Sequence, residues 1–267
     1  MLNNISFGQY YPSNSLIHRL DARFKLVITL ALIVVAFIAL NFVSMGVVAL
    51  SVLAMMFVSK VPIKMYLKTF KSIWFFIVLT AVLNIFFIQG KTPLVTFWSI
   101  KIYSEGVEKA IFIAIRIFLL LIISSALTFT TTPTSLTDAI ESLLKPLSKI
   151  GINTHTFAMM MTIALRFIPT LIEETDKIMN AQKARGASMD EGSIIKKVKA
   201  VIPILIPLLA SSIRRAYELA DAMECRCYHG GEGRTRLNVM KSSLKDYVAL
   251  LLFFALISAV VVCNILF

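Results

Sequence analysis

Charged residues are scarce in this sequence, and acidic residues are the scarcest. Only 16% of its 267 residues are charged, 15 Asp and Glu against 27 Lys and Arg, with three histidines and three cysteines. A soluble domain carries about 25% charged residues. The chain has no His-Glu-x-x-His pair and no glycine-rich Walker A loop, and its apolar stretches contain no paired acidic cluster for Mg²⁺ and diphosphate. Three cysteines make no disulfide framework either, so we expect neither an enzyme nor a disulfide-stapled domain.

Apolar residues are what the chain has in excess. They form 58% of it, and the mean hydropathy is +0.81. The net charge is +12, but no basic stretch is interleaved with the stacking aromatic side chains that a single-strand nucleic-acid binder requires. Lysines and arginines retained on the cytosolic side of a membrane explain the basic charge better. We therefore predict a membrane protein with no nucleic-acid partner.

Five apolar stretches predict transmembrane helices, each near the roughly 20 residues that a bilayer core requires. They are residues 26–42, 43–59, 73–88, 110–129 and 248–267, with a tight turn at 41–44. The predicted fold is an all-α, polytopic membrane protein. Residues 1–131 would hold four spans, residues 132–245 a cytosolic section of one short and two long amphipathic helices, and residues 246–267 the last span.

Basic residues in the short loops predict the orientation. They precede the first stretch or connect the second to the third: His18, Arg19, Arg23, Lys25, Lys60, Lys64, Lys68 and Lys71. The positive-inside rule then places the N-terminus and the section 132–246 in the cytosol. Residues 90–108 would be external, with a small hairpin over the strand-like residues 94–103.

Arg116 interrupts the fourth apolar stretch. A charge within a span is a functional hypothesis by default. The alternative is a snorkelling residue, or a packing partner near a helix end. No carboxylate in the other predicted spans would complete a proton or ion relay with it.

Two long helices of similar design are predicted in the cytosolic section, over residues 154–183 and 196–226. Each would be about 45 Å long at 1.5 Å per residue, apolar in its first half and charged in its second. Pro203 and Pro207 predict a kink in the second helix, and Arg214 with Glu218 suits an i,i+4 pair. Neither helix is expected to be a comfortable span.

Each long helix ends on an arginine. The first ends with Ala184, Arg185 and Gly186, and the second with Cys225, Arg226 and Cys227. Arginine at a helix C-terminus is favoured by the helix dipole, so two well-capped helices are one interpretation. The other is capture of a partner carboxylate, because the planar guanidinium binds carboxylates in a bidentate manner.

Four segments together carry a family resemblance. Residues 18–26 (HRLDARFKL) are close to a Leu-Asp-Pro-Arg-x-Lys signature, with Ala22 in place of the proline; the other segments are 165–169 (LRFIP), 181–186 (AQKARG) and 222–228 (AMECRCY). Over nearly its whole length the chain resembles the transmembrane coupling (T) component of energy-coupling factor (ECF) transporters, the EcfT/CbiQ-like family.

The resemblance implies how the section 132–245 acts. In the family, two Ala-Arg-Gly motifs at the tips of the coupling helices insert into grooves of two ATP-binding-cassette ATPase subunits. Arg185 and Arg226 would then be the docking residues, although cysteines flank the second arginine. The motif and coupling-helix residues beside them are Asp21, Arg23, Arg166, Pro169, Ala184, Gly186, Pro203, Pro207, Glu224, Cys225 and Cys227.

The other implied partner is a substrate-binding membrane protein, the S component. ATP would be bound by the ATPases, and this chain would need no cofactor. The location would be the bacterial cytoplasmic membrane. Substrate choice would belong to the S component, so nothing in this sequence selects a vitamin or a metal ion.

Two competing readings remain at this point. Cys225, Cys227 and His229 could bind a metal, but structural zinc requires four ligands. A channel or secondary transporter would show internal repeats or broken polar helices at the midplane, and Pro203 with Pro207 is the only hint of that.

Overall fold

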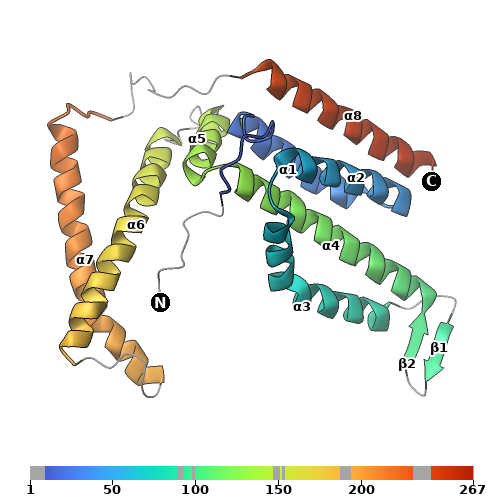
Figure 1. Cartoon of the computed structure of the whole chain (residues 1–267), viewed down its shortest axis with the longest axis horizontal. Coiled ribbons are helices and arrows are strands. Elements are labelled where there is room, and N and C mark those ends of the chain that lie inside the picture. Colours follow the sequence, from blue (N-terminus) through green and yellow to red (C-terminus); the bar gives the residue numbers. More distant parts are fainter. Residues whose placement is uncertain are drawn as a thin grey trace. The chain divides into compact units, whose positions relative to one another are not determined.

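Helices make up almost all of this computed structural model (Figure 1). The structure describes residues 10–88, 93–97, 100–146, 151, 154–186, 194–230 and 242–266. The elements are α1 (Ala22–Ile38), α2 (Phe42–Ser59), α3 (Ile63–Phe87), β1 (Pro93–Phe97), β2 (Ile100–Tyr103), α4 (Ser104–Thr130), α5 (Pro133–Leu144), α6 (Thr154–Ala184), α7 (Ile194–Glu224) and α8 (Leu244–Leu266). The predicted all-α fold class is confirmed.

The chain divides into two compact units. One, the five-helix unit, comprises Gly8–Ala139 and Met240–Phe267 and holds α1 to α4 and α8. The other, the crossed-helix unit, comprises Met1–Phe7 and Ile140–Val239 and holds α6 and α7. The boundary between them falls within α5.

All five predicted spans are helical, although each begins earlier than predicted, most of all α3 at Ile63 and α4 at Ser104. The turn between α1 and α2 lies at 39–41, and the predicted turn at 41–44 was placed too late. Within the described part of the chain, six helices are long and apolar enough to cross a membrane: α2, α3, α4, α6, α7 and α8. The helix α1, with 17 residues, is slightly shorter. Since α6 and α7 also qualify, length and composition do not separate coupling helices from spans. The predicted boundaries at 131/132 and 245/246 stay predictions.

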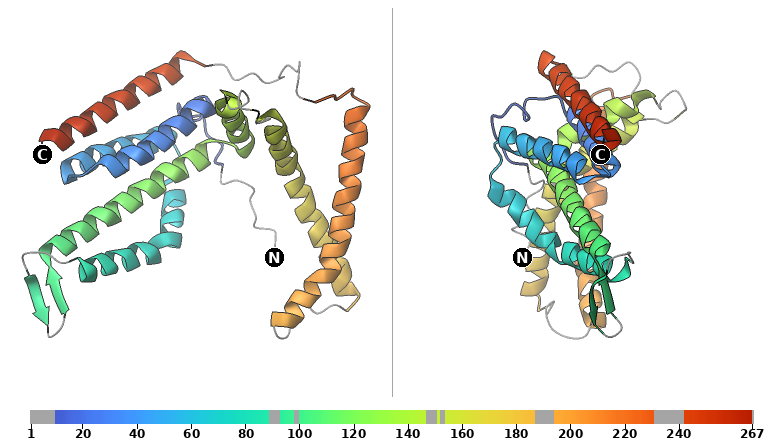
Figure 2. Two further views of the ribbon diagram at one scale, coloured as in Figure 1. Left: turned by 180° about the vertical axis from the view of Figure 1, so that it is seen from behind. Right: turned by 90° about the vertical axis from the view of Figure 1, so that its right-hand side faces the viewer.

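The core of the five-helix unit lies between α1, α2, α4 and α8, with α3 packed along α4 (Figures 1 and 2). Small and β-branched side chains let the helices approach closely, and Ala36, Val48 and Val52 are fully buried. Large apolar side chains such as Phe87 and Leu251 face outward instead. That distribution suits helices whose outer surface is solvated by lipid.

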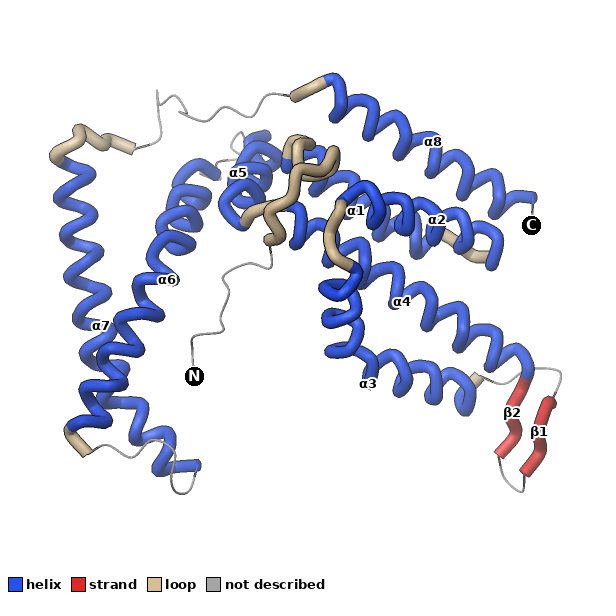
Figure 3. Tube along the Cα trace, viewed as in Figure 1, coloured by secondary structure: helices blue, strands red, loops and turns tan. Residues whose placement is uncertain are grey.

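The predicted hairpin is confirmed between α3 and α4, where two strands are drawn in red in Figure 3. They pair antiparallel, with Val95 opposite Ile102 and Phe97 opposite Ile100. The residues that join the two strands lie outside the described part of the chain.

Arg116 binds the turn that joins α1 to α2. Its Nη2 donates to the carbonyl oxygen of Ala39, the C-cap of α1, at 2.6 Å, and its guanidinium lies 4.8 Å from the ring centroid of Phe112. Asn264 of α8 holds the same turn, accepting from the Leu40 amide at 3.2 Å and donating to the Ile38 carbonyl at 2.8 Å. Arg116 is therefore a partner of a helix end.

Replacing Arg116 by Met is expected to destabilise the five-helix unit by about 2 kcal/mol. The change removes a charge-assisted hydrogen bond, worth about 1.5–3 kcal/mol, and leaves the Ala39 carbonyl with one donor fewer. The measurement is the unfolding temperature of the purified chain in detergent. The exposed Lys109→Met on the same helix is the control, and equal unfolding temperatures for the two variants would disprove the assignment.

Candidate partner-docking site

The first predicted tip, at the end of α6, is a tightly closed helix terminus. The Arg185 amide donates to the carbonyls of Ala181 and Gln182, and the Gly186 amide donates to the carbonyl of Lys183 at 3.0 Å. Gly186 has φ +88°, in the left-handed region where glycine carries no steric penalty. The backbone itself closes the helix, and this leaves the Arg185 side chain out of the cap.

The second tip, at the end of α7, closes in the same way. The Cys227 amide donates to the Glu224 carbonyl at 2.8 Å and the Tyr228 amide to the Met223 carbonyl at 3.0 Å, which is the Schellman pattern. Cys227 takes the left-handed position with φ +56°. Cys225, Arg226 and Cys227 therefore occupy the positions at the end of α7 that Ala184, Arg185 and Gly186 occupy at the end of α6.

Exchanging the two left-handed residues is expected to shift stability in opposite directions. A side chain in this region costs about 1–2 kcal/mol relative to glycine, so Cys227→Gly should stabilise the last turn of α7 by about 1 kcal/mol. Gly186→Cys should destabilise the last turn of α6 by a similar amount; a Cβ there meets nothing within 4 Å, so only the backbone angle opposes it.

Amide hydrogen exchange of the last turns reports both effects. Slower exchange at residues 223–228 in Cys227→Gly and faster exchange at 181–186 in Gly186→Cys are expected. The same exchange rates as in the unmodified chain, in both variants, would contradict the equivalence of the two tips.

Both arginine side chains are free to bind a partner. Arg185 and Arg226 are exposed, and neither forms a side-chain hydrogen bond or an ion pair with any residue that the structure describes. Cys225 and Cys227 are exposed as well. No group of three or more metal-binding side chains occurs among the described residues, which include His229. The geometry thus gives no support to the metal reading.

The helices α6 and α7 contact each other and cross (Figure 1 and the left view of Figure 2). Arg215 of α7 donates from Nη2 to Oε2 of Glu174 on α6 at 3.1 Å. The predicted pair of Arg214 with Glu218 is not formed within these described helices. Arg185 and Arg226 each lie about 16 Å, three turns, beyond this ion pair along their own helices. Since the helices run in opposite directions, the two arginines diverge from the crossing.

The predicted bend in α7 is visible in its first half, drawn in the lighter orange of Figure 2. Pro203 and Pro207 both lie inside the helix and both are exposed. Each proline removes a backbone donor, and its ring displaces the preceding turn. Pro169 lies inside α6, with Arg166 one turn earlier, and both are exposed.

The N-terminal signature residues cap α1. Asp21 is the N-cap and accepts from the Arg23 amide at 2.9 Å, while Arg23 Nη2 pairs with Asp21 Oδ2 at 2.6 Å. Desolvation alone would raise the pKa of Asp21, but the hydrogen bonds from Arg23 outweigh it and hold that pKa below its ordinary value. Asp21 and Arg23 are therefore structural within the five-helix unit and lie in the part of the sequence that begins α1.

One residue that completes this cluster was not predicted from the sequence. Asp246, only 1% exposed in the first turn of α8, accepts from the Asp21 amide at 2.8 Å and from the Ser243 amide at 2.6 Å. Lys25 Nζ donates to the carbonyls of His18 and Thr130, at 3.2 and 3.0 Å. The available sequence signal was an acidic residue at the start of an otherwise apolar helix, because an acid that becomes buried there requires a partner.

Comparison with known proteins identifies the family of this arrangement. A family model described as cobalt transport protein, CbiQ, matches residues 13–237. The chain belongs to the CbiQ family. It is 48% identical over 264 residues to the energy-coupling factor transporter transmembrane protein EcfT of Clostridium kluyveri, covering 98% of this chain and 96% of that protein. The EcfT proteins of Ruminiclostridium cellulolyticum and Streptococcus equi are 46% and 43% identical, over 92% and 94% of this chain and 92% and 93% of their own lengths.

As a CbiQ-family T component, the protein is a multi-pass membrane subunit of an energy-coupling factor transporter and assembles with other subunits. It is not an enzyme; ATP hydrolysis belongs to partner ATPases. The family that the sequence motifs indicated is thereby confirmed.

Proposed function

We propose that this chain links ATP hydrolysis by two ATPase subunits to the reorientation of a substrate-binding S component, for uptake of a vitamin or a metal ion. The observation that carries the proposal is the pair of exposed arginines on diverging helix ends with equivalent caps. Two equivalent tips that point away from one crossing suit two equivalent partner grooves better than one.

The coupling step would act on the crossing of α6 and α7. ATPases that close on ATP would carry the two tips with them, and the crossing angle would change around the pair of Arg215 with Glu174. Both members of that pair are partly exposed, at 34% and 25% of the side-chain surface. A partly exposed ion pair is worth only about 0.2–1 kcal/mol, so it would orient the helices without locking them.

An apolar strip on α7 would hold the S component. Val201, Leu205 and Leu209 recur at four-residue intervals and are 53%, 57% and 60% exposed. Such a contiguous exposed strip indicates an apolar partner or lipid. A change in crossing angle would then tilt that partner.

The membrane placement is part of the proposal. We place the N-terminus and both tips in the cytosol of a bacterial cell, on the side where the loop lysines gather, so that the ATPases can reach them. ATP would be held by those partners, and this chain would hold no cofactor. The substrate would be selected by the S component.

The test is a pull-down of the tagged full-length chain from detergent-solubilised native membranes, with the copurified subunits identified by mass spectrometry. Two ATP-binding-cassette ATPases and one or more small apolar membrane proteins are expected, and those small proteins name the substrates. If the chain purifies without partners, or if replacing Arg185 and Arg226 by alanine changes neither copurification nor uptake, the result favours a secondary transporter instead.

A further inference from the structure

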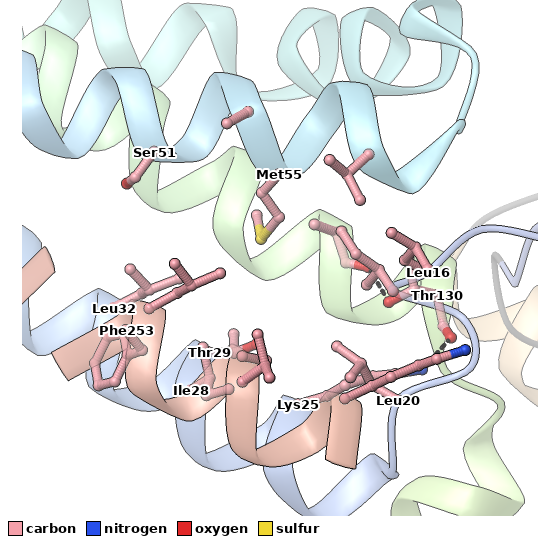
Figure 4. A pocket seen from close by; sticks show the side chains of 18 of the residues that line it. Leu16, Leu20, Lys25, Ile28, Thr29, Leu32, Ser51, Met55, Thr130 and Phe253 are labelled. Carbon is pink, nitrogen blue, oxygen red and sulfur yellow. Dashed lines mark hydrogen bonds between the residues drawn. The ribbon is translucent and has the colours of Figure 1, made fainter. Parts of the chain in front are cut away.

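Two neighbouring hollows in the five-helix unit serve no part of the docking mechanism. The larger is an apolar cavity of about 650 Å³ between α1, α2, α4 and α8, shown in Figure 4. The smaller is a polar pocket of about 230 Å³ at the start of α1 and the end of α4. They share Leu20, Lys25 and Thr130 as a common wall.

The cavity spans about one leaflet. Its lining on α8 runs from Leu244 to Leu256, about 18 Å of helix at 1.5 Å per residue. Half of a bilayer core is about 15 Å thick. The remaining lining comes from the segment before α1 (Leu16, Ile17 and Leu20), the first part of α1 and the last parts of α2 and α4. The cavity therefore lies at the end of the helices that the basic loops assign to the cytosol.

The basic groups of Lys25 and Arg19 line the polar pocket, and the two carboxylates near Lys25, Asp21 and Asp246, already accept hydrogen bonds from other groups. Lys25 is 7% exposed, its Nζ makes two hydrogen bonds among the described residues, and a third donor remains. Exposed Arg19 lines the pocket, and exposed Lys245 lines the cavity beside it. Asp21, the acid in its wall, is already bound by Arg23.

An unpartnered hydroxyl marks the same pocket. Thr131 is 7% exposed, lines the polar pocket, and its Oγ1 is buried without a hydrogen-bond partner in the described structure. A buried hydroxyl without a partner costs about 1–3 kcal/mol, which a ligand oxygen would recover. Burial lowers the pKa of His18, the other basic group of the pocket, and the charge of Lys25 adds to that effect.

We propose that the two hollows form one binding site for an anionic phospholipid of the cytosolic leaflet. One acyl chain occupies the cavity, and the phosphate lies in the polar pocket against Lys25, Arg19 and Thr131. Volume and lining fit this ligand: small-molecule sites measure about 300–1,000 Å³ and are mostly apolar with a few placed polar groups. Basic pockets between transmembrane helices on the cytosolic side bind anionic lipid headgroups. The site belongs to this chain alone and does not depend on the docking mechanism.

Native mass spectrometry of the full-length chain in detergent tests the proposal, with dioleoyl phosphatidylglycerol and dioleoyl phosphatidylcholine as probes. Phosphatidylglycerol is expected to bind at least tenfold more tightly. Arg19→Gln with Lys245→Gln should weaken it about 30-fold, since each surface cation contributes about 1 kcal/mol, and Thr131→Val about fivefold, the worth of one hydrogen bond. The double variant Lys64→Gln with Lys68→Gln removes the same charge elsewhere and should change nothing.

A cavity-filling variant tests the acyl chain separately. Ala249→Phe, which fills the cavity from α8, should abolish binding of both lipids, and the exposed Ala255→Phe on the same helix should leave it unchanged. Ala54→Phe fills the cavity from α2 if the first variant fails to fold. Equal binding of the two lipids overturns the proposal, and so does oleate that binds as tightly as phosphatidylglycerol. A photo-crosslinker at position 249 that captures a polypeptide in native membranes also overturns it.

Discussion

Replacing both Arg185 and Arg226 by alanine is expected to strip the ATPase subunits from the purified transporter and to abolish uptake. Each guanidinium is exposed and has no partner among the described residues. An arginine at the centre of a docking groove is typically worth about 2–4 kcal/mol, and 1.4 kcal/mol is about tenfold in affinity. One substitution should weaken ATPase binding about 30-fold or more, and two should abolish copurification.

The caps make this experiment interpretable. Backbone amides close both helix ends, so alanine at either position leaves the helices intact. Lysine at both positions keeps the charge but loses the planar fork, and it should restore binding only in part. Lys177→Ala with Arg214→Ala removes two exposed charges from the same helices and should bind normally. Full ATPase recovery and normal uptake in the double alanine variant would end the docking proposal.

The sequence predicted the elements of this protein better than their contacts. Apolar runs about one bilayer long located all five predicted spans, and strand-like residues located the hairpin. The cap of α5 is a contact that the sequence analysis did not predict: Thr132 Oγ1 accepts from the Ser135 amide at 3.2 Å. Pro133 then occupies the first helical position, where its missing N–H costs nothing.

Contacts between distant residues left no local pattern to read. Arg116 looked like a lone charge, since its acceptor is a carbonyl of another helix. The equivalence of the two tips could be predicted in part, because the sequence places an arginine at the end of each long helix. That Cys227 takes the glycine position could be seen only from its φ angle.

Asp246 illustrates the same limit and carries the second large prediction. Its carboxylate accepts from two backbone amides, Asp21 and Ser243, and so joins the start of α8 to the start of α1. It also lies close enough to the buried ammonium of Lys25 to stabilise it electrostatically. Hydrogen bonds to a charged group contribute about 1.5–3 kcal/mol each. Asp246→Ala is therefore expected to destabilise the five-helix unit by about 3–5 kcal/mol, lowering its unfolding temperature by on the order of 10 °C.

The physical reason is that alanine removes the acceptor shared by the amides of Asp21 and Ser243, and also the negative charge that stabilises the buried ammonium of Lys25. Asp246→Asn keeps the shape and one acceptor oxygen but presents an NH₂ group to the other amide, so it should lie between alanine and the unmodified chain. Glu108→Ala, an exposed acid early in α4, is the matched control and should unfold at the unmodified temperature. If Asp246→Ala unfolds at the same temperature as Glu108→Ala, then α8 is held by its apolar face alone, and the polar cluster at its start contributes nothing to stability.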